Sequence, residues 1–178
     1  MIEILNIILV ITFIYFLTLF PFDKNFSFKK IDFKSLTNVD VHILNLIFHM
    51  MVLFIASFLP IKIIYLIFLQ LIIGVTLLIS KILFKKLNFL NTYYKVDIFL
   101  LFLITFILSI DLASNLNLGW DSQFRWIIKA LNFYQGNSIN NLVNFTDPEY
   151  PHFGSYLWAY FWKVSILNYE YTGRIIYL

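Results

Sequence analysis

The sequence predicts an all-α polytopic membrane protein with about five transmembrane helices. Hydrophobic residues make up 61% of its 178 positions and charged residues only 13%, whereas soluble domains average about 45–50% and about 25%. A chain of this length cannot enclose so much apolar surface in a water-soluble core. The apolar residues also occur in runs close to the roughly 20 residues that a helix needs to cross a bilayer.

Five such runs are separated by polar segments. The first has no basic start and no small-residue cleavage site, which indicates a retained helix and not a cleaved signal. The fifth is aromatic and short, so its ends are not sharply defined. In one membrane domain over residues 1–178, the predicted helices are about Ile2–Phe20, Val41–Leu59, Ile61–Ser80, Val96–Ala113 and Phe153–Leu167.

Lysines set the orientation of these helices, because short loops rich in Lys and Arg stay in the cytoplasm. The eight lysines that do so here are Lys24, Lys29, Lys30, Lys34, Lys81, Lys85, Lys86 and Lys95. By alternation the N-terminus, the turn at Pro60 and the loop Ser114–His152 are expected outside. The fifth helix is then expected to return to the cytoplasm, where Arg174 fits.

Several function classes find no support in the sequence. A net charge of +3 is too small to indicate nucleic acid binding, and the absence of cysteine excludes disulfides and thiol chemistry. Motifs for nucleotide binding, zinc proteases and serine hydrolases are missing. His42 and His49 lie two helical turns apart, about 10.5 Å, which is too far to ligate one zinc ion. We expect them to be interhelical hydrogen-bonding or interfacial residues.

The external stretch Asp121–Tyr134 has the periodicity of an amphipathic helix lying in the headgroup region. Its spacing allows an Asp121–Arg125 ion pair. An alternative is that Asp121 only caps the helix and that the cations form a solvated or phospholipid-contacting face. The apolar face holds Phe124, Ile127, Ile128 and Leu131, and the polar face holds Asp121, Arg125, Lys129 and Asn132.

A second polar group lies just before the fifth helix. Asp147, Glu149 and His152 crowd together there, and the prolines between them stiffen the approach. This pattern also fits an ordinary loop-to-helix junction. A further alternative is that Asp147 and Glu149 hold a divalent cation through their oxygens.

The segments "GWDSQFRWIIKALNFY" and "DPEYPHFGSYLWAYFW" together resemble the first large external loop of GT-C-type membrane glycosyltransferases. The likeness is to the bacterial branch related to protein O-mannosyltransferases and lipopolysaccharide-core glycosyltransferases, and it covers about Gly119–Trp162. The matching positions are Trp120, Asp121, Trp126, Lys129, Ala130, Asp147, Tyr150, Pro151, Leu157 and Trp162.

The resemblance implies an inverting enzyme that moves a sugar from a polyprenyl-phosphate carrier to a glycan, lipid or protein acceptor. The reaction would take place on the outer face of the bacterial inner (plasma) membrane, among membrane lipids and without nucleic acid. Asp121 stands at the position of the catalytic base, which accepts the proton of the acceptor hydroxyl. The expected substrate-binding residues are Trp120, Arg125, Lys129, Asp147, Glu149, Tyr150 and His152.

Arg125 and Lys129 would stabilise the phosphate leaving group. No metal is expected, although a divalent cation stays an alternative. Two features depart from the pattern: three apolar segments precede the fourth helix, and the chain has about half the usual number of helices. We therefore expect the N-terminal part of a longer enzyme. The competing functions are a non-catalytic membrane subunit and an O-antigen polymerase or flippase-like polysaccharide protein.

Overall fold

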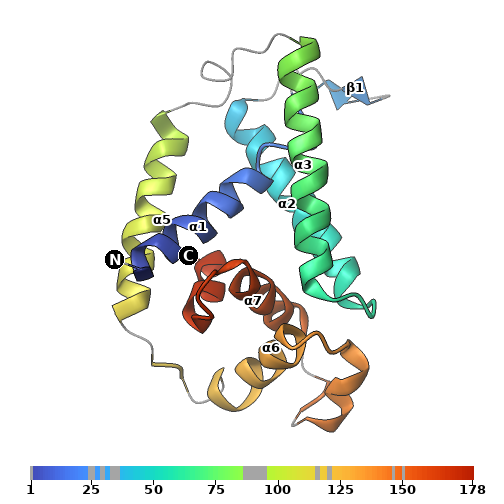
Figure 1. The fold of residues 1–178 in the computed structure, drawn as a ribbon, viewed down its shortest axis with the longest axis vertical. Coiled ribbons are helices and arrows are strands. Elements are labelled where there is room, and N and C mark those ends of the chain that lie inside the picture. The colour runs from blue at the N-terminus through green and yellow to red at the C-terminus, as the bar shows by residue number, and fades with distance from the viewer. Residues whose placement is uncertain are drawn as a thin grey trace.

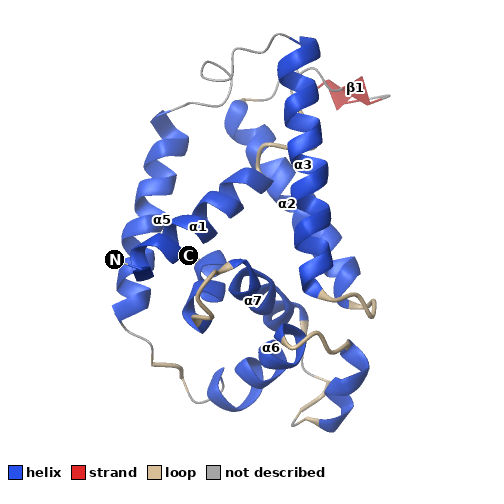
Figure 2. Cartoon of the chain, viewed as in Figure 1, coloured by secondary structure: helices blue, strands red, loops and turns tan. Residues whose placement is uncertain are grey.

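The computed structural model describes residues 2–23, 27–28, 31–32, 37–85, 96–114, 117–119, 122–145, 147–149 and 151–178. Helices dominate them (Figure 2), so the predicted all-α class is confirmed. The two-residue strands β1 (Ser27–Phe28) and β2 (Ile31–Asp32) form an antiparallel pair. The α-helices are α1 (Ile2–Leu17), α2 (Asn38–Ser57), α3 (Ile63–Lys85), α5 (Val96–Ser114), α6 (Ile127–Tyr134) and α7 (Phe153–Val164). Segment η2 (Ser122–Trp126) is a π-helix, and η3 (Ile139–Asn144) and η4 (Glu170–Tyr177) are 3-10 helices.

Two helices are long and apolar enough to cross a bilayer. The candidate spans are Asn38–Ser57 in α2 and Ile63–Leu83 in α3, with mean hydropathies of 2.0 and 2.6. Most of their surface is uncovered; Met51 and Ile72, for example, are 60% and 65% exposed. An exposed apolar surface of this extent fits contact with lipid. The described helices do not confirm five spans, since α1 and α5 have 16 and 19 residues and α7 only 12.

Helix α2 begins three residues earlier than its hydrophobicity indicates. The Asp40 amide donates to the Thr37 hydroxyl (3.1 Å), and the Thr37 amide donates to the Asp40 carboxylate (2.8 Å). This reciprocal capping box satisfies donors that a helix start leaves unpaired. The polar residues that start α2 therefore lie outside the apolar run that predicted the helix.

The end of α1 is held by polar side chains of α2 and α3. Backbone carbonyls of residues 18–20 accept hydrogen bonds from Asn45 (2.8 Å), Lys81 (3.2 Å) and His49 (3.0 Å). These carbonyls lack partners within their own helix, so the side chains satisfy them. His42 also bonds to Thr18, and the predicted interhelical hydrogen-bonding role of both histidines is confirmed.

The remaining helices form a separate layer at one end of this bundle of α1, α2, α3 and α5 (Figure 1). We call it the α6–α7 layer; it comprises the described residues of 122–178. It lies at the end where α2 turns into α3, because His152 contacts Ser57 and Gly136 lies near Lys62. The start of α1 also reaches it, through a bond from the Leu167 amide to Asn6 (3.4 Å).

The fifth predicted span, Phe153–Leu167, corresponds to α7 and ends at Val164. Twelve residues extend about 18 Å, well short of the roughly 30 Å of a bilayer core. Every residue from Ser155 to Trp162 is buried, as expected for a core helix that is apolar all round. The chain then folds back, and Arg174, expected in the cytoplasm, lies in the α6–α7 layer beside Trp158.

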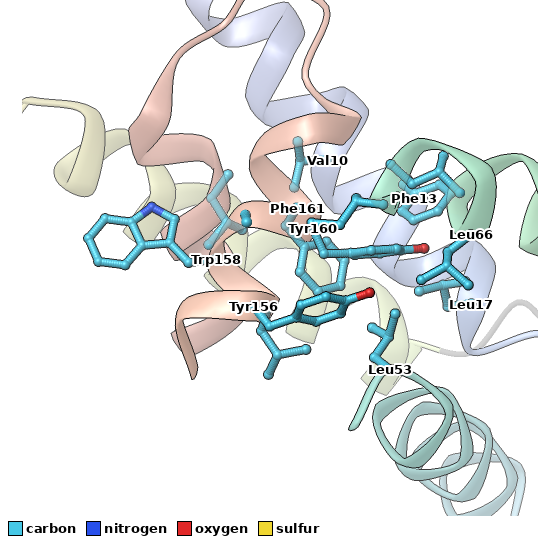
Figure 3. Close-up of a cluster of buried hydrophobic side chains, with 14 of the residues drawn as sticks. Val10, Phe13, Leu17, Leu53, Leu66, Tyr156, Trp158, Tyr160 and Phe161 are labelled. Carbon is cyan, nitrogen blue, oxygen red and sulfur yellow. The ribbon is translucent and has the colours of Figure 1, made fainter. Parts of the chain in front are cut away.

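The core joins the layer to the bundle. Figure 3 shows Tyr156 and Tyr160 on one side of α7, near Leu53 and Leu66, while Trp158 points away from them. Trp158 instead faces η4, where Gly173 packs on its backbone. A Cβ at Gly173 would overlap the Trp158 carbonyl oxygen. Only glycine therefore lets η4 approach α7 this closely.

Candidate active site in the α6–α7 layer

The amphipathic helix predicted around residue 128 is present, as η2 followed by α6. Its apolar side chains Phe124, Ile128 and Leu131 are 52%, 36% and 41% exposed, so they face away from the protein. Its polar face turns inward, where Lys129 and Asn132 are buried. The alternative of a solvated or lipid-contacting cationic face is thus wrong for Lys129.

Arg125 and Asp147 form the centre of the polar cluster. The Arg125 Nε atom lies 2.7 Å from an Asp147 carboxylate oxygen, and both side chains are about one-quarter exposed. Asp147 has a φ of 54°, a left-handed conformation that Asp adopts more readily than most residues. The ion pair across 22 positions holds this unusual backbone in place.

Lys129 also binds Asp147, through the backbone carbonyl and not the carboxylate. Its side chain is fully buried, and its ammonium group donates a hydrogen bond to the Asp147 carbonyl oxygen at 2.6 Å. Burial lowers the pKa of Lys129, and Arg125 adds to this, while the carboxylates of Asp147 and Glu149 oppose it. A buried ammonium is costly unless it is paired. The contact therefore ties α6 to the loop before α7.

His152 connects the cluster to the bundle. Its Nε2 atom lies 2.9 Å from the Ser57 hydroxyl, which itself donates to the Phe54 carbonyl. The hydroxyl proton is thus used, so Nε2 donates to the Ser57 oxygen. The rings of Phe58 and Phe133 flank His152, and burial, with the nearby Lys129 charge, lowers the pKa of His152.

The structure brings together four of the eight predicted site residues: Arg125, Lys129, Asp147 and His152. Glu149 is exposed but close enough to influence the pKa of Lys129. Trp120, Asp121 and Tyr150 lie outside the described residues, so their predicted roles and the Asp121–Arg125 pair stay predictions. Within the described residues no three His, Asp or Glu side chains gather as a metal site, and Asp147 faces a guanidinium group.

Sequence reasoning missed two groups around the cluster. Ser57 ends α2 and Phe58 begins the turn between the candidate spans, and no local pattern marked them. Trp158, Arg174 and Tyr177 line a pocket together with Trp126. Arg174 had been expected after a fifth span, whereas it lies in the α6–α7 layer. Glu170 and Arg174 form an ion pair at i,i+4 spacing. This spacing is the sequence signal that could have predicted a helix over residues 170–177.

No family model matches this chain, and the comparisons with curated proteins and with solved structures return no match either.

Proposed function

We propose that this chain is the membrane glycosyltransferase, or the front part of one, that its loop sequence resembles. It would transfer a sugar from a polyprenyl-phosphate carrier to an acceptor on the outer face of the bacterial inner membrane. The observation that supports this most is the convergence of the two motif segments. Arg125 and Lys129 of the first segment both bind Asp147 of the second.

In the proposed membrane topology, one end of the bundle faces outward and the other faces the cytoplasm. The N-terminus, the α2–α3 turn and the α6–α7 layer lie at one end, as a shared external side requires. Helices α1, α2, α3 and α5 are proposed to cross the membrane. Helix α7 is not, because it is short and buried. The exposed apolar side of α6 would lie in the headgroup region.

In this proposal Asp121 removes the proton from the acceptor hydroxyl as that oxygen attacks the anomeric carbon. The sugar–phosphate bond breaks, and the phosphate leaves with the prenyl chain. Arg125, which is partly exposed, is the cation best placed to meet that phosphate. Lys129 is enclosed, so its proposed role is to position Asp147, whose carboxylate with Glu149 would orient acceptor hydroxyls.

The test is transfer from a synthetic prenyl-phosphate sugar by purified protein in nanodiscs, comparing Asp121→Asn with wild type. Removing a general base costs roughly 10²- to 10⁴-fold in rate. The matched control is Asp111→Asn, which changes an exposed acid of α5 and should leave the rate unchanged. Equal rates for Asp121→Asn and wild type would remove Asp121 from catalysis. A wild-type protein inactive with every donor and acceptor tried would overturn the proposal.

The complete enclosure of Lys129 favours one second candidate, a non-catalytic membrane subunit in which the cluster only stabilises the layer. An O-antigen polymerase or flippase-like protein belongs to the same outcome, because neither uses Asp121 as a base. An inactive wild type that copurifies with a larger membrane enzyme in fixed ratio would support this candidate.

A further inference from the structure

A pocket of about 290 Å³ opens beside the polar cluster. Three parts of the chain form it: Leu118 with the η2 residues Ser122 and Trp126, the first half of α7, and η4. Of the predicted site residues that the structure describes, none lines it, yet Ser122 of its wall follows Asp121 directly in the chain. Its chemistry is carried by Ser122, Trp126, Ser155, Trp158, Arg174 and Tyr177.

Most of the wall is aromatic and apolar. Trp126 is partly exposed, and Trp158 lies deeper, with its indole N–H donating to the Glu170 carbonyl at 3.2 Å. The Arg174 guanidinium lies 5.9 Å above the Trp158 ring. Indole faces favour a ligand that has a flat apolar side. They disfavour one that is polar all round.

Hydrogen-bonding capacity remains at the edge of this wall. The Ser155 hydroxyl donates to the Trp126 carbonyl (3.0 Å), and the Tyr177 hydroxyl donates to the Gly154 carbonyl. Each oxygen can still accept a bond. Arg174 meets Glu170 through Nε at 3.2 Å and Nη2 at 3.4 Å. A guanidinium has five N–H donors, and only the Nη2 contact is a hydrogen bond, so further donors are left over.

Charge narrows the ligand class. Glu170 neutralises Arg174, so the pocket presents donors without a net positive charge. A phosphate group would meet the Glu170 carboxylate as well as the guanidinium. A hydrocarbon chain would leave the remaining guanidinium donors and hydroxyl lone pairs without partners and away from water, which is unfavourable. A neutral ligand with one apolar face and several hydroxyls avoids the repulsion from Glu170 and also supplies hydrogen-bond partners to the polar groups of the wall.

We infer that this pocket binds a neutral pyranose ring, with its C–H face against Trp126 and its hydroxyls toward Arg174 and Ser122. This inference deepens the proposed function. Binding of the sugar does not depend on the proposed transfer reaction, and only the use of the bound sugar as donor or acceptor rests on it. The sugar of the donor and the terminal sugar of an acceptor glycan share this ring chemistry. Either can be the source.

The test is the binding of methyl hexopyranosides (glucoside, mannoside, galactoside and N-acetylglucosaminide), followed by tryptophan fluorescence. The protein is held in nanodiscs, because sugar-based detergents would compete for the pocket. At least one glycoside should saturate the signal, and Trp126→Ala should weaken its binding at least tenfold. The control is Trp162→Phe, since Trp162 stacks on Tyr134 and does not line the pocket, so binding should change less than twofold.

Arg174→Lys separates a binding role from a folding role. Lysine keeps the charge but loses the planar fork, so glycoside binding should weaken at least fivefold while the melting temperature stays close to wild type. Glu170→Gln should let inorganic phosphate compete with the glycoside, which it does not do in wild type. If no glycoside saturates the signal, or if Trp126→Ala binds as well as wild type, the inference is wrong. Saturable binding of a neutral prenol that Trp126→Ala abolishes, in place of a glycoside, would also overturn it.

Two further experiments ask whether the bound sugar comes from the donor or the acceptor, and whether the pocket and the proposed transferase activity stand or fall separately. A prenyl-phosphate sugar that displaces the glycoside indicates the donor, and a reducing-end oligosaccharide that does so indicates the acceptor. Asp121→Asn should bind the glycoside as wild type does. Glycoside binding without any transfer would leave the pocket standing and overturn the transferase. Transfer without glycoside binding would overturn the pocket alone.

Discussion

Helices α3 and α7 both lie in predicted membrane spans but have opposite surroundings. Helix α3 has 23 residues and leaves much of its surface exposed, with Leu83 67% accessible, whereas α7 has 12 residues and buries eight in a row. One face of α3, with Ile63, Leu66 and Ile67, packs in the core, and the exposed apolar side chains of its other faces fit lipid. Those of α7 are enclosed by α6, η4, α1 and α3. The candidate span therefore differs from the core helix in both length and apolar character.

Polar side chains also behave differently in the two regions. In the bundle they donate to separate backbone carbonyls at the end of α1, between 27 and 62 positions away. In the α6–α7 layer, Arg125 and Lys129 both bind one loop residue, Asp147, through its carboxylate and its carbonyl. One chain of hydrogen bonds connects the regions: the Tyr160 hydroxyl donates to Gln70, whose amide lies 3.3 Å from His49 Nδ1.

The largest expected effect comes from separating η4 from α7. Gly173→Ala places a methyl group against the Trp158 carbonyl, which is backbone and cannot move aside. We expect a loss of about 3 kcal/mol in the free energy of unfolding, measured by SDS titration in mixed micelles, and loss of glycoside binding.

Gly154→Ala is the matched control for Gly173→Ala. Its new Cβ would lie 3.7 Å from the Tyr177 hydroxyl, an ordinary contact, and alanine favours a helix. Stability should be unchanged or slightly raised. If both variants are equally stable, η4 does not pack on α7 as described.

A smaller effect is expected when Lys129 loses its charge. Lys129→Met leaves the Asp147 carbonyl without its donor, and a hydrogen bond to a charged group contributes about 2 kcal/mol. The same SDS titration measures this, with Lys62→Met as the control because Lys62 is exposed. A loss of less than about 0.5 kcal/mol, the range of ordinary surface changes, would contradict the enclosed hydrogen bond.

The smallest effect tests the link between the regions. Tyr160→Phe removes the donor to the buried Gln70 oxygen and should cost about 1 kcal/mol. Tyr65→Phe, at a position 64% exposed, should cost almost nothing. The measurement is the SDS unfolding midpoint of Tyr160→Phe compared with that of Tyr65→Phe. Coincident midpoints would mean that the hydrogen bond between Tyr160 and Gln70 contributes no stability.

The sequence allowed the long elements to be predicted because their periodicity and length are local properties. Of the predicted apolar face, Phe124, Ile128 and Leu131 are exposed, whereas Ile127 is partly buried and packs against the core. The partner of Arg125 could not be found this way, because it depends on how a loop with a left-handed Asp147 folds back. The position of Arg174 in the α6–α7 layer depends likewise on how the chain folds back after α7. Counting alternate membrane crossings assumes that each apolar run crosses, and α7 is too short to do so.

The most direct test of the central comparison is single-cysteine labelling, which the chain permits because it contains no cysteine. Asn168 lies exposed between α7 and η4. If α7 crosses the membrane, Asn168 is cytoplasmic, and if α7 is a core helix of the external layer, Asn168 is external. Asn168→Cys in intact cells should react with a membrane-impermeant maleimide, as should Asn137→Cys, exposed after α6. Asn91→Cys, in a loop predicted to be cytoplasmic, should react only after lysis. Labelling of Asn168→Cys only after lysis, with Asn137→Cys labelled from outside, would show that α7 crosses the membrane and would contradict this account.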